Sequence, residues 1–491
     1  MYDMQQDLDR IEAVIAKGPY KDNWESLSAY TVPEWYKQAK FGIFIHWGVY
    51  SVPAFANEWY PRNMYIRGTK EYEYHIGKYG PQKDFGYKDF IPMFRAERFD
   101  PDEWAALFKE AGARYVVEVA EHHDGFQMYK SRISHWNAAE KGPCRNVMGD
   151  LEYACKREGL IFGTSSHRAE HWFFMGEGRR FDSDIHEPLE RGDFYWPSMP
   201  LESGHHDLFA KPVPTEEYLN DWLVRTCEII DTYQPQILYF DWWIQESIFK
   251  PYLQKLAAYY YNRAAEWGRG VVINYKHDAF LFGTAVPDIE RGQFAAIQPF
   301  YWQTDTAVAK NSWGYTEGNE YKDPRDIVQD LVDIVSKNGN LLLNVGPKPD
   351  GTITDEDAEV LRGIGKWLAV NGEAIYGAGI YRKPGEGPTA TPEGQFSDGV
   401  KKNYTSEDFR FTTAKGCLYA IALKASEDGK YCIHTLDEKD ASRMANFHGI
   451  IEDVNVLGCD EKPVWHREED GLYLETSFRS DYPVTFKIRL K

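Results

Sequence analysis

The chain has few cysteines and no long hydrophobic run. Its 491 residues include no stretch that approaches about 20 consecutive apolar residues, and residues 1–21 carry charges throughout, so the sequence predicts neither a membrane span nor a signal peptide. The six cysteines form no C-x-x-C pair and no zinc-like spacing, which disfavours a disulfide scaffold and predicts free thiols. The expected location is the cytoplasm or, if a signal peptide has been removed, the periplasm or the cell exterior.

Positive charge is scarce as well. The net charge of −20 argues against nucleic acid or an anionic membrane surface as a partner. No G-x-G-x-x-G motif follows a strand and no phosphate loop of the G-x-x-x-x-G-K type occurs, so no nucleotide cofactor is expected. Aromatic residues are abundant by contrast, at 15% of the chain with 16 tryptophans. That content is compatible with a sugar site lined by ring faces and equally with a large aromatic core.

Strand and helix signals alternate from about residue 38 to residue 375. Short apolar runs predict strands at 41–46, 115–120, 160–165, 236–241, 271–274 and 340–345. Segments with helical spacing predict helices at 101–111, 151–158, 216–233, 251–267, 324–336 and 356–368. Alternation of this kind implies parallel strands with helical crossovers, so the sequence predicts an α/β fold of the barrel type.

The pattern changes after residue 377. Residues 383–388, rich in glycine and proline, predict a linker or loop. Short alternating runs with turn residues between them follow at 409–413, 417–423, 431–435, 450–457, 472–476 and 484–490. Spacing of this kind is typical of an antiparallel β-sandwich.

Chemically active side chains stand at the ends of several predicted strands or just past them. They are His46, His122, His123, Asp241 and Lys276. In an α/β barrel such positions converge on the C-terminal face, where catalytic groups lie. Asp241, which aromatic residues flank, suits sugar chemistry, although an Asp here is equally typical of a helix cap. The histidines are either structural or a row of donors and acceptors for sugar hydroxyls.

Several sequence blocks, taken in order and spacing, indicate a family resemblance. They are FGIFIHWG at 41–48, EWY at 58–60, HHDGF at 122–126, the strand end 238–243, SWGY at 312–315 and GNLLLNVGP at 339–347. On these blocks the chain resembles the α-L-fucosidases of glycoside hydrolase family 29 over nearly its whole length. The resemblance implies a (β/α)8-like barrel as catalytic domain, here residues 1–378, followed by a C-terminal antiparallel β-sandwich at 379–491.

The resemblance also implies an activity and a set of site residues. The implied enzyme is a retaining exo-glycosidase that removes terminal α-L-fucosyl residues from oligosaccharides or glycoconjugates by double displacement, without a metal or other cofactor. The implied nucleophile is Asp241. Lys276 stands where many members of the family have an Arg, and we place it among the substrate-binding residues. The other implied fucose contacts are His46, Glu58, Trp59, His122 and His123, with Trp313 in the aromatic wall.

The second catalytic carboxylate is open, because the acid/base position varies within the family. Glu290 is the choice, since it lies after the 271–274 strand on a loop expected to reach the face that carries Asp241. Asp288 is an alternative, although it follows a proline and suits a turn. Glu58 is a second alternative, but it belongs to the EWY block at 58–60, to which the resemblance assigns contacts with fucose.

Two other functions are open on the sequence. His167, Glu170 and His171 match H-x-x-E-H, the motif of inverted zinc proteases, and predict a zinc metallohydrolase if they lie on a helix. The other alternative is a non-catalytic carbohydrate-binding protein. Loss of the nucleophile would favour it, but Asp241 is present. The sequence carries no signal for an oligomeric state.

Overall fold

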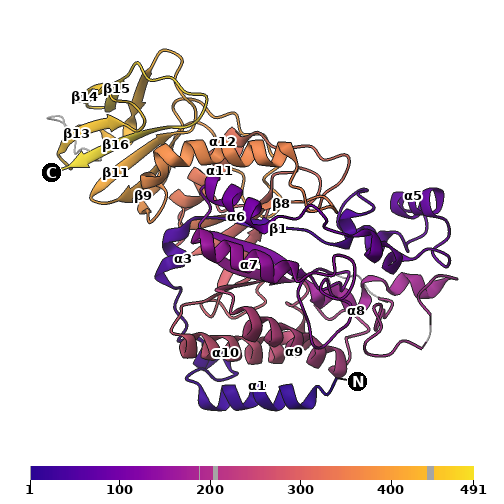
Figure 1. The fold of residues 1–491 in the computed structure, drawn as a ribbon. Helices are drawn as coiled ribbons and strands as arrows, with labels where there is room; N and C mark the ends of the chain where they lie inside the picture. The colour runs from indigo at the N-terminus through magenta and orange to yellow at the C-terminus, as the bar shows by residue number, and fades with distance from the viewer. Residues whose placement is uncertain (1, 187, 203–207, 439–446) are drawn as a thin grey trace.

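Eight parallel strands close into a barrel at the centre of the molecule (Figure 1). The structure is a computed structural model that describes residues 2–186, 188–202, 208–438 and 447–491. Each strand pairs in parallel with the next, and the last pairs with the first. The strands are β1 (Phe41–Ile45), β2 (Tyr115–Glu121), β3 (Ile161–Ser166), β4 (Ile237–Phe240), β5 (Val272–Tyr275), β6 (Val286–Glu290), β7 (Trp302–Ala307) and β8 (Gly339–Val345).

Long helices carry the chain from one strand to the next around the outside of the barrel. They are α6 (Pro101–Glu110), α7 (Val147–Glu158), α9 (Glu216–Tyr233), α10 (Lys250–Trp267), α11 (Pro324–Ser336) and α12 (Asp355–Asn371). The shorter helices and the N-terminal one are α1 (Gln5–Lys17), α2 (Trp24–Leu27), α3 (Glu34–Ala39), α4 (Tyr60–Asn63), α5 (Lys70–Tyr79) and α8 (His171–Phe174). Residues 276–285 and 291–301 are fully described and contain no helix, so the β5–β6 and β6–β7 connections are simple loops.

Local sequence signals set the ends of these helices. Thr215 caps α9 and Thr354 caps α12, because each hydroxyl accepts a hydrogen bond from a free backbone N–H of the first turn. Gly159 and Gly268 end α7 and α10 in the left-handed conformation that glycine adopts without strain. None of the described helices is long and apolar enough to cross a membrane.

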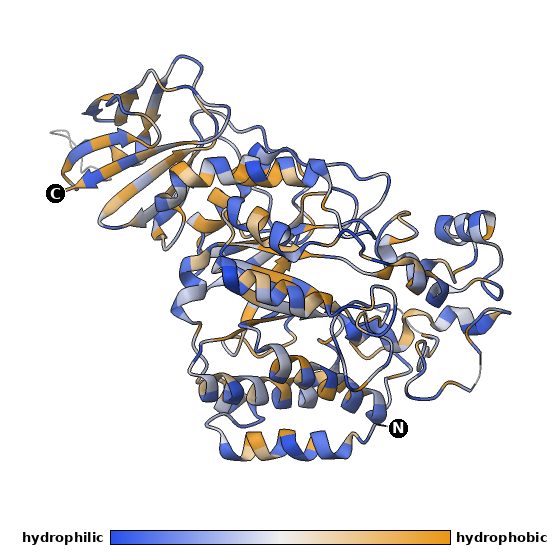
Figure 2. Cartoon of the chain, viewed as in Figure 1, coloured by the Kyte–Doolittle hydropathy of each residue, from blue (hydrophilic) through white to orange (hydrophobic). Residues whose placement is uncertain are grey.

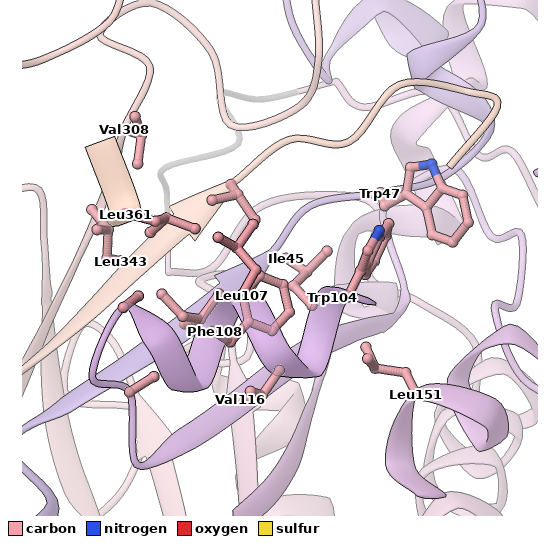
Figure 3. Packing of buried hydrophobic residues seen from close by; sticks show 14 of the residues in the cluster. Ile45, Trp47, Trp104, Leu107, Phe108, Val116, Leu151, Val308, Leu343 and Leu361 are labelled. Carbon is pink, nitrogen blue, oxygen red and sulfur yellow. The ribbon is translucent and has the colours of Figure 1, made fainter. Parts of the chain in front are cut away.

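The barrel wall is held to its helices by apolar packing (Figure 3). Trp104, Leu107 and Phe108 lie on one face of α6, at the spacing that places side chains together on a helix. They belong to the same buried cluster as Ile45 of β1 and Leu343 of β8. Burying each large side chain stabilises the fold by about 1.5–3 kcal/mol. This packing fixes where the ends of β1 and β8 stand.

The barrel interior is polar beside β6 and β7, and neither strand was predicted from the sequence. Gln303 of β7 accepts hydrogen bonds from the phenols of Tyr36 and Tyr115, at 3.0 and 3.1 Å, and donates one to Asp288 of β6 at 2.8 Å. Asp305 of β7 accepts a hydrogen bond from the phenol of Tyr239 at 2.7 Å. Because these inward positions are amide and carboxylate groups, the apolar pattern that indicates a strand is missing there.

Two antiparallel sheets follow the barrel and pack face to face, at the end of the molecule that holds the C-terminus (Figure 1). One has the order β13-β16-β11-β10-β9 and the other β12-β15-β14. Hydrophobic and hydrophilic residues alternate along these strands (Figure 2). Their bounds are β9 (Gly379–Glu386), β10 (Phe409–Ala414), β11 (Cys417–Ala422), β12 (Lys430–Ile433), β13 (Ile451–Val456), β14 (Val464–Glu468), β15 (Gly471–Glu475) and β16 (Val484–Leu490).

The observed architecture confirms the predicted fold class, a barrel of alternating strands and helices followed by an antiparallel sandwich. The loop expected at 383–388 was wrong for most of its length, because those residues belong to β9, the edge strand beside β10. Proline is tolerated on an edge, where its missing N–H faces away from the sheet. The cysteines of the chain are all free, as expected.

Candidate active site

A cavity of about 580 Å³ opens at the C-terminal ends of the barrel strands, a volume suited to a small ligand. The strand ends supply it: His46 follows β1, Asp241 follows β4, and Lys276 follows β5. The structure brings every predicted site residue to this cavity. These are His46, Glu58, Trp59, His122, His123, Asp241, Lys276, Glu290 and Trp313.

Asp241 is a partly buried carboxylate, 15% exposed, held by three cationic or hydrogen-bonding neighbours. Its Oδ2 accepts a hydrogen bond from Nδ1 of His167 at 3.1 Å and lies 3.5 Å from Nε2 of His123. Its Oδ1 lies 3.8 Å from Nζ of Lys276. Burial opposes ionisation, but the imidazoles and the lysine outweigh it and hold the pKa of Asp241 well below its usual range. The side chain is therefore an anion near neutral pH.

Three histidines beside Asp241 are neutral. Burial, reinforced by the neighbouring imidazoles, lowers the pKa values of His46 and His122 well below the usual histidine value and also lowers that of His167. Nδ1–H of His46 donates to the side-chain oxygen of Asn344 at 2.7 Å. Neutral imidazoles each carry one donor and one acceptor, a set that suits the hydroxyls of a sugar.

His123 differs from the other histidines, because it lies between two carboxylates. Its Nδ1–H donates to the backbone carbonyl of His167 at 2.9 Å, and the carboxylate of Glu170, fully buried, lies 3.7 Å from the same nitrogen. Burial lowers its pKa, but Glu170 and Asp241 outweigh burial and raise the pKa of His123 to about 9. His123 therefore presents a cation to Asp241.

Lys276 is a buried cation enclosed by carboxylates. Its Nζ lies 3.0 Å from Glu290, 3.1 Å from Asp305, 3.8 Å from Asp241 and 3.9 Å from Asp288. Burial disfavours the charged amine, but the surrounding carboxylates outweigh it and raise its pKa. Lys276 therefore carries a fixed positive charge in the lining of the cavity.

Glu290 ends β6 and is 16% exposed to the cavity. Burial raises its pKa, Lys276 lowers it, and the charges of Asp241 and Asp305 raise it again, to about 7 in all. One pocket thus holds an ionised Asp241 beside a Glu290 that keeps its proton up to neutrality. Such a pair of carboxyls with separated pKa values is the arrangement that acid/base and nucleophilic roles require.

The two alternatives to Glu290 lie in different settings. Asp288 does not line the cavity: its buried carboxyl points into the barrel and accepts a hydrogen bond from Gln303. Glu58 does line the cavity, but its Oε2 accepts hydrogen bonds from the backbone N–H of Trp313 at 3.0 Å and from the hydroxyl of Ser312 at 3.2 Å. Glu58 therefore anchors the segment that carries the Trp313 wall.

Aromatic side chains form the walls of the cavity. The ring of Trp313 lies 5.2 Å from that of His46, and the guanidinium of Arg291 lies 4.6 Å from its centroid. The ring of Trp59 lies 5.6 Å from that of His123 and 6.3 Å from that of Trp242. Ring faces on two sides suit the apolar faces of a pyranose.

The H-x-x-E-H segment lacks the helix that a zinc-protease motif requires. His167 follows β3, a short 3₁₀ turn covers Arg168–Glu170, and α8 begins only at His171. His167 faces Asp241, whereas Nδ1–H of His171 donates to the backbone carbonyl of His123 at 3.0 Å. The structure therefore does not support the zinc metallohydrolase interpretation. Among the described residues, the groups close enough to hold an ion are His46–His122–His167 and His123–His167–Asp241, both within the cavity.

Sequence reasoning missed several residues of this site. His167 and Tyr239 both line the cavity. The signal for His167 was available, since it stands just past the end of the predicted strand 160–165. Gln395 and Phe396 also line the cavity, and no sequence signal connects them to the barrel.

Comparisons with known proteins agree on one family. The family model described as Alpha-L-fucosidase matches residues 8–373. Plasma alpha-L-fucosidase of Homo sapiens is 32% identical over 434 residues, which cover 84% of this chain and 80% of that protein. The crystal structure of Thermotoga maritima alpha-fucosidase superimposes with a TM-score of 0.76 at 30% identity, over 96% of this chain and 100% of that one. The same Thermotoga enzyme in complex with fucose gives a TM-score of 0.73 over 96% of this chain and 100% of that one, also at 30% identity.

Proposed function

The chain belongs to the α-L-fucosidase family of glycoside hydrolases, and from this premise we propose that it hydrolyses α-L-fucosides with retention of configuration, with Asp241 as nucleophile and Glu290 as acid/base. The observation that carries the proposal is the opposite shift of two pKa values around one lysine. The pKa of Asp241 is held well below its usual range, and that of Glu290 is raised to about 7. A retaining glycosidase needs an ionised nucleophile beside a protonated acid.

The reaction proceeds in two displacements. In the first, a carboxylate oxygen of Asp241 forms a bond to the anomeric carbon while the glycosidic bond breaks, and Glu290 gives its proton to the departing oxygen. In the second, the Glu290 carboxylate takes a proton from water, the water oxygen bonds to the anomeric carbon, and Asp241 leaves as a carboxylate. The fucose released has the α configuration of the substrate.

The spacing of the two carboxylates supports this mechanism. Nζ of Lys276 lies 3.8 Å from Oδ1 of Asp241 and 3.0 Å from Oε2 of Glu290, so these oxygens are no farther apart than the sum of the two distances. In inverting enzymes the two carboxyl groups are about 6.5–9.5 Å apart, which leaves room for water between them. The limit found here lies near the lower end of that range. It is compatible with the about 5–5.5 Å of retaining ones.

The substrates that we propose are fucosylated oligosaccharides or glycoconjugates. The neutral imidazoles of His46 and His122 offer donors and acceptors to the sugar hydroxyls, and Trp59 and Trp313 offer ring faces. The complex of the Thermotoga maritima relative with fucose supports the choice of sugar.

The first product of hydrolysis tests the mechanism. We expect NMR spectra, recorded within seconds of mixing the enzyme with an aryl α-L-fucoside, to show α-L-fucose before the anomers equilibrate. Initial release of β-L-fucose would mean that water attacks the substrate directly, and Asp241 would then have to act as a base.

Lys276→Met should move both limbs of the kcat/KM–pH profile to higher pH and lower the maximum on the order of 10²-fold. Lys276 lowers the pKa of Asp241 and of Glu290, so both carboxyls keep their protons to higher pH without it. Protonation of Asp241 sets the acid limb, and loss of the Glu290 proton, near pH 7 in the native chain, sets the basic limb. Both limbs therefore shift in the same direction.

Lys337→Met provides the matched control. Lys337 is also a buried lysine, paired with Asp333, but it does not line the cavity. Each substitution removes a buried cation from beside a buried carboxylate. Lys276→Met should destabilise the fold by about 3–5 kcal/mol and Lys337→Met by less, because Asp333 keeps its ion pair with Arg410. A pH profile that moves equally in both variants, or in neither, would show that Lys276 does not set the protonation of the pair.

The hydrolysis should not depend on a metal ion, because no step of the double displacement requires one. We expect excess EDTA to leave the rate unchanged and elemental analysis of the active enzyme to show no stoichiometric zinc. Loss of activity on chelation, restored by zinc, would instead assign catalysis to a metal held by the cavity histidines.

A further inference from the structure

A segment far along the chain returns to the catalytic cavity. Residues 394–398 lie between β9 and β10 of the C-terminal sheets, yet they pair with residues 290–293 at the end of β6. The backbone N–H of Phe396 donates to the carbonyl of Glu290, and that of Asp398 to the carbonyl of Arg291, both at 2.9 Å. The backbone N–H of Gly394 donates to the carbonyl of Gln293, also at 2.9 Å. The segment therefore pairs with the chain at the end of β6, on the rim of the barrel, where the residue proposed as acid/base lies.

Side chains anchor this segment as well. The partly buried carboxylate of Asp398 accepts hydrogen bonds from the ammonium of Lys322 and the hydroxyl of Thr306, and lies 3.4 Å from the guanidinium of Arg291. A Cβ at Gly292 would lie 1.9 Å from the carbonyl oxygen of Gly394, so the two backbones touch where only glycine fits. The position of residues 394–398 against β6 is thus fixed.

Phe396 is the exposed member of the segment. Its side chain is 63% exposed and lines the rim of the cavity, next to Gln395. Its backbone has φ of +54°, a conformation that a bulky residue rarely adopts and that costs about 1–3 kcal/mol. A large apolar side chain that is exposed to water contributes little to the core. Residues with a strained backbone conformation cluster at active sites and ligand sites.

We propose that Phe396 forms the platform for the leaving-group sugar, so that the segment between β9 and β10 completes the substrate site. The inference rests on the function proposed above. The acid must contact the glycosidic oxygen, and the leaving group lies beyond that oxygen. The backbone N–H of Phe396 is bonded to the carbonyl of Glu290 and both residues line one cavity, so we assign the ring to the leaving-group side of the acid. A pyranose stacks its apolar face on such a ring, and Gln395 offers an amide to its hydroxyls.

Substrates with and without a leaving-group sugar test the proposal. We compare an α-L-fucosyl disaccharide that has a hexopyranose leaving group with α-L-fucosyl fluoride, whose leaving group has no ring. In Phe396→Ala the ratio of kcat/KM for the disaccharide to kcat/KM for the fluoride should fall about ten-fold. Transfer of fucose from the fluoride to an added hexose acceptor should fall by a similar factor. Phe396→Tyr, which keeps the ring, should restore both.

Phe282→Ala is the control, because Phe282 is similarly exposed, at 60%, and does not line the cavity. It should change neither the ratio nor the transfer yield. The proposal would be overturned by a Phe396→Ala enzyme that unfolds at the native temperature and keeps the native ratio, whether both activities are unchanged or are reduced equally. Failure of the proposed function is distinguishable, because it would show in the native enzyme as inactivity on fucosyl fluoride or as inversion.

Discussion

Asp241→Gly should fold as the native chain does and lose at least about 10³-fold in kcat on an aryl α-L-fucoside. The side chain is the ionised carboxylate that His123, His167 and Lys276 hold in the cavity. Glycine leaves a space at the position of the carboxylate. Added azide should occupy that space, attack the anomeric carbon and restore part of the rate, with β-fucosyl azide as product.

The configuration of the azide product makes this test specific. Azide that replaces the nucleophile attacks the α-fucoside once, so the product is inverted. Asp124→Asn is the control, since Asp124 is a buried carboxyl bonded to Tyr87 at 2.7 Å and does not line the cavity. Azide should not accelerate that variant. Retention of near-native activity in Asp241→Gly would remove Asp241 from the mechanism.

The strand-end residues show how much of this site could be predicted from sequence. Apolar runs mark β1, β2 and β4, and in a barrel the residue after each run must face the same end. His46, the His122–His123 pair and Asp241 were placed correctly by this rule, and the structure brings them to one cavity. His167 also follows a strand, β3, but the sequence interpretation assigned it to the H-x-x-E-H zinc motif instead of the sugar site.

Strands β6 and β7 could not be predicted, for a physical reason. Lys276, Asp288 and Asp305 fill the interior there as a network of charges, so β6 and β7 do not show an apolar pattern. The loops that join these strands have no helix to mark a boundary. Phe396 lies on a segment that reaches the cavity only through tertiary pairing with β6, which no local pattern encodes.

Glu290→Ala should show a loss that depends on the leaving group. A natural oligosaccharide expels a basic alkoxide that needs a proton, so kcat/KM should fall about 10²- to 10⁴-fold. A nitrophenolate scarcely needs protonation, so kcat/KM for a nitrophenyl fucoside should change little. The basic limb of the native profile, set by the Glu290 pKa of about 7, should disappear for that substrate. Rates measured on both substrates across pH 5–9, on the order of two units either side of that pKa, provide the check.

Azide separates the acid/base from the nucleophile. Without a base, water attacks the β-fucosyl enzyme slowly, and the covalent intermediate accumulates on an activated substrate. Azide needs no base, so it should raise kcat of Glu290→Ala and give α-fucosyl azide, the product of two inversions, where the Asp241→Gly variant gives the β anomer. Asp288→Ala and Glu58→Ala should show neither the leaving-group dependence nor the rescue, because one carboxyl points into the barrel and the other holds the Trp313 segment. Rescue with an α-azide product in either of those variants would transfer the acid/base role to that residue and leave Asp241 in place.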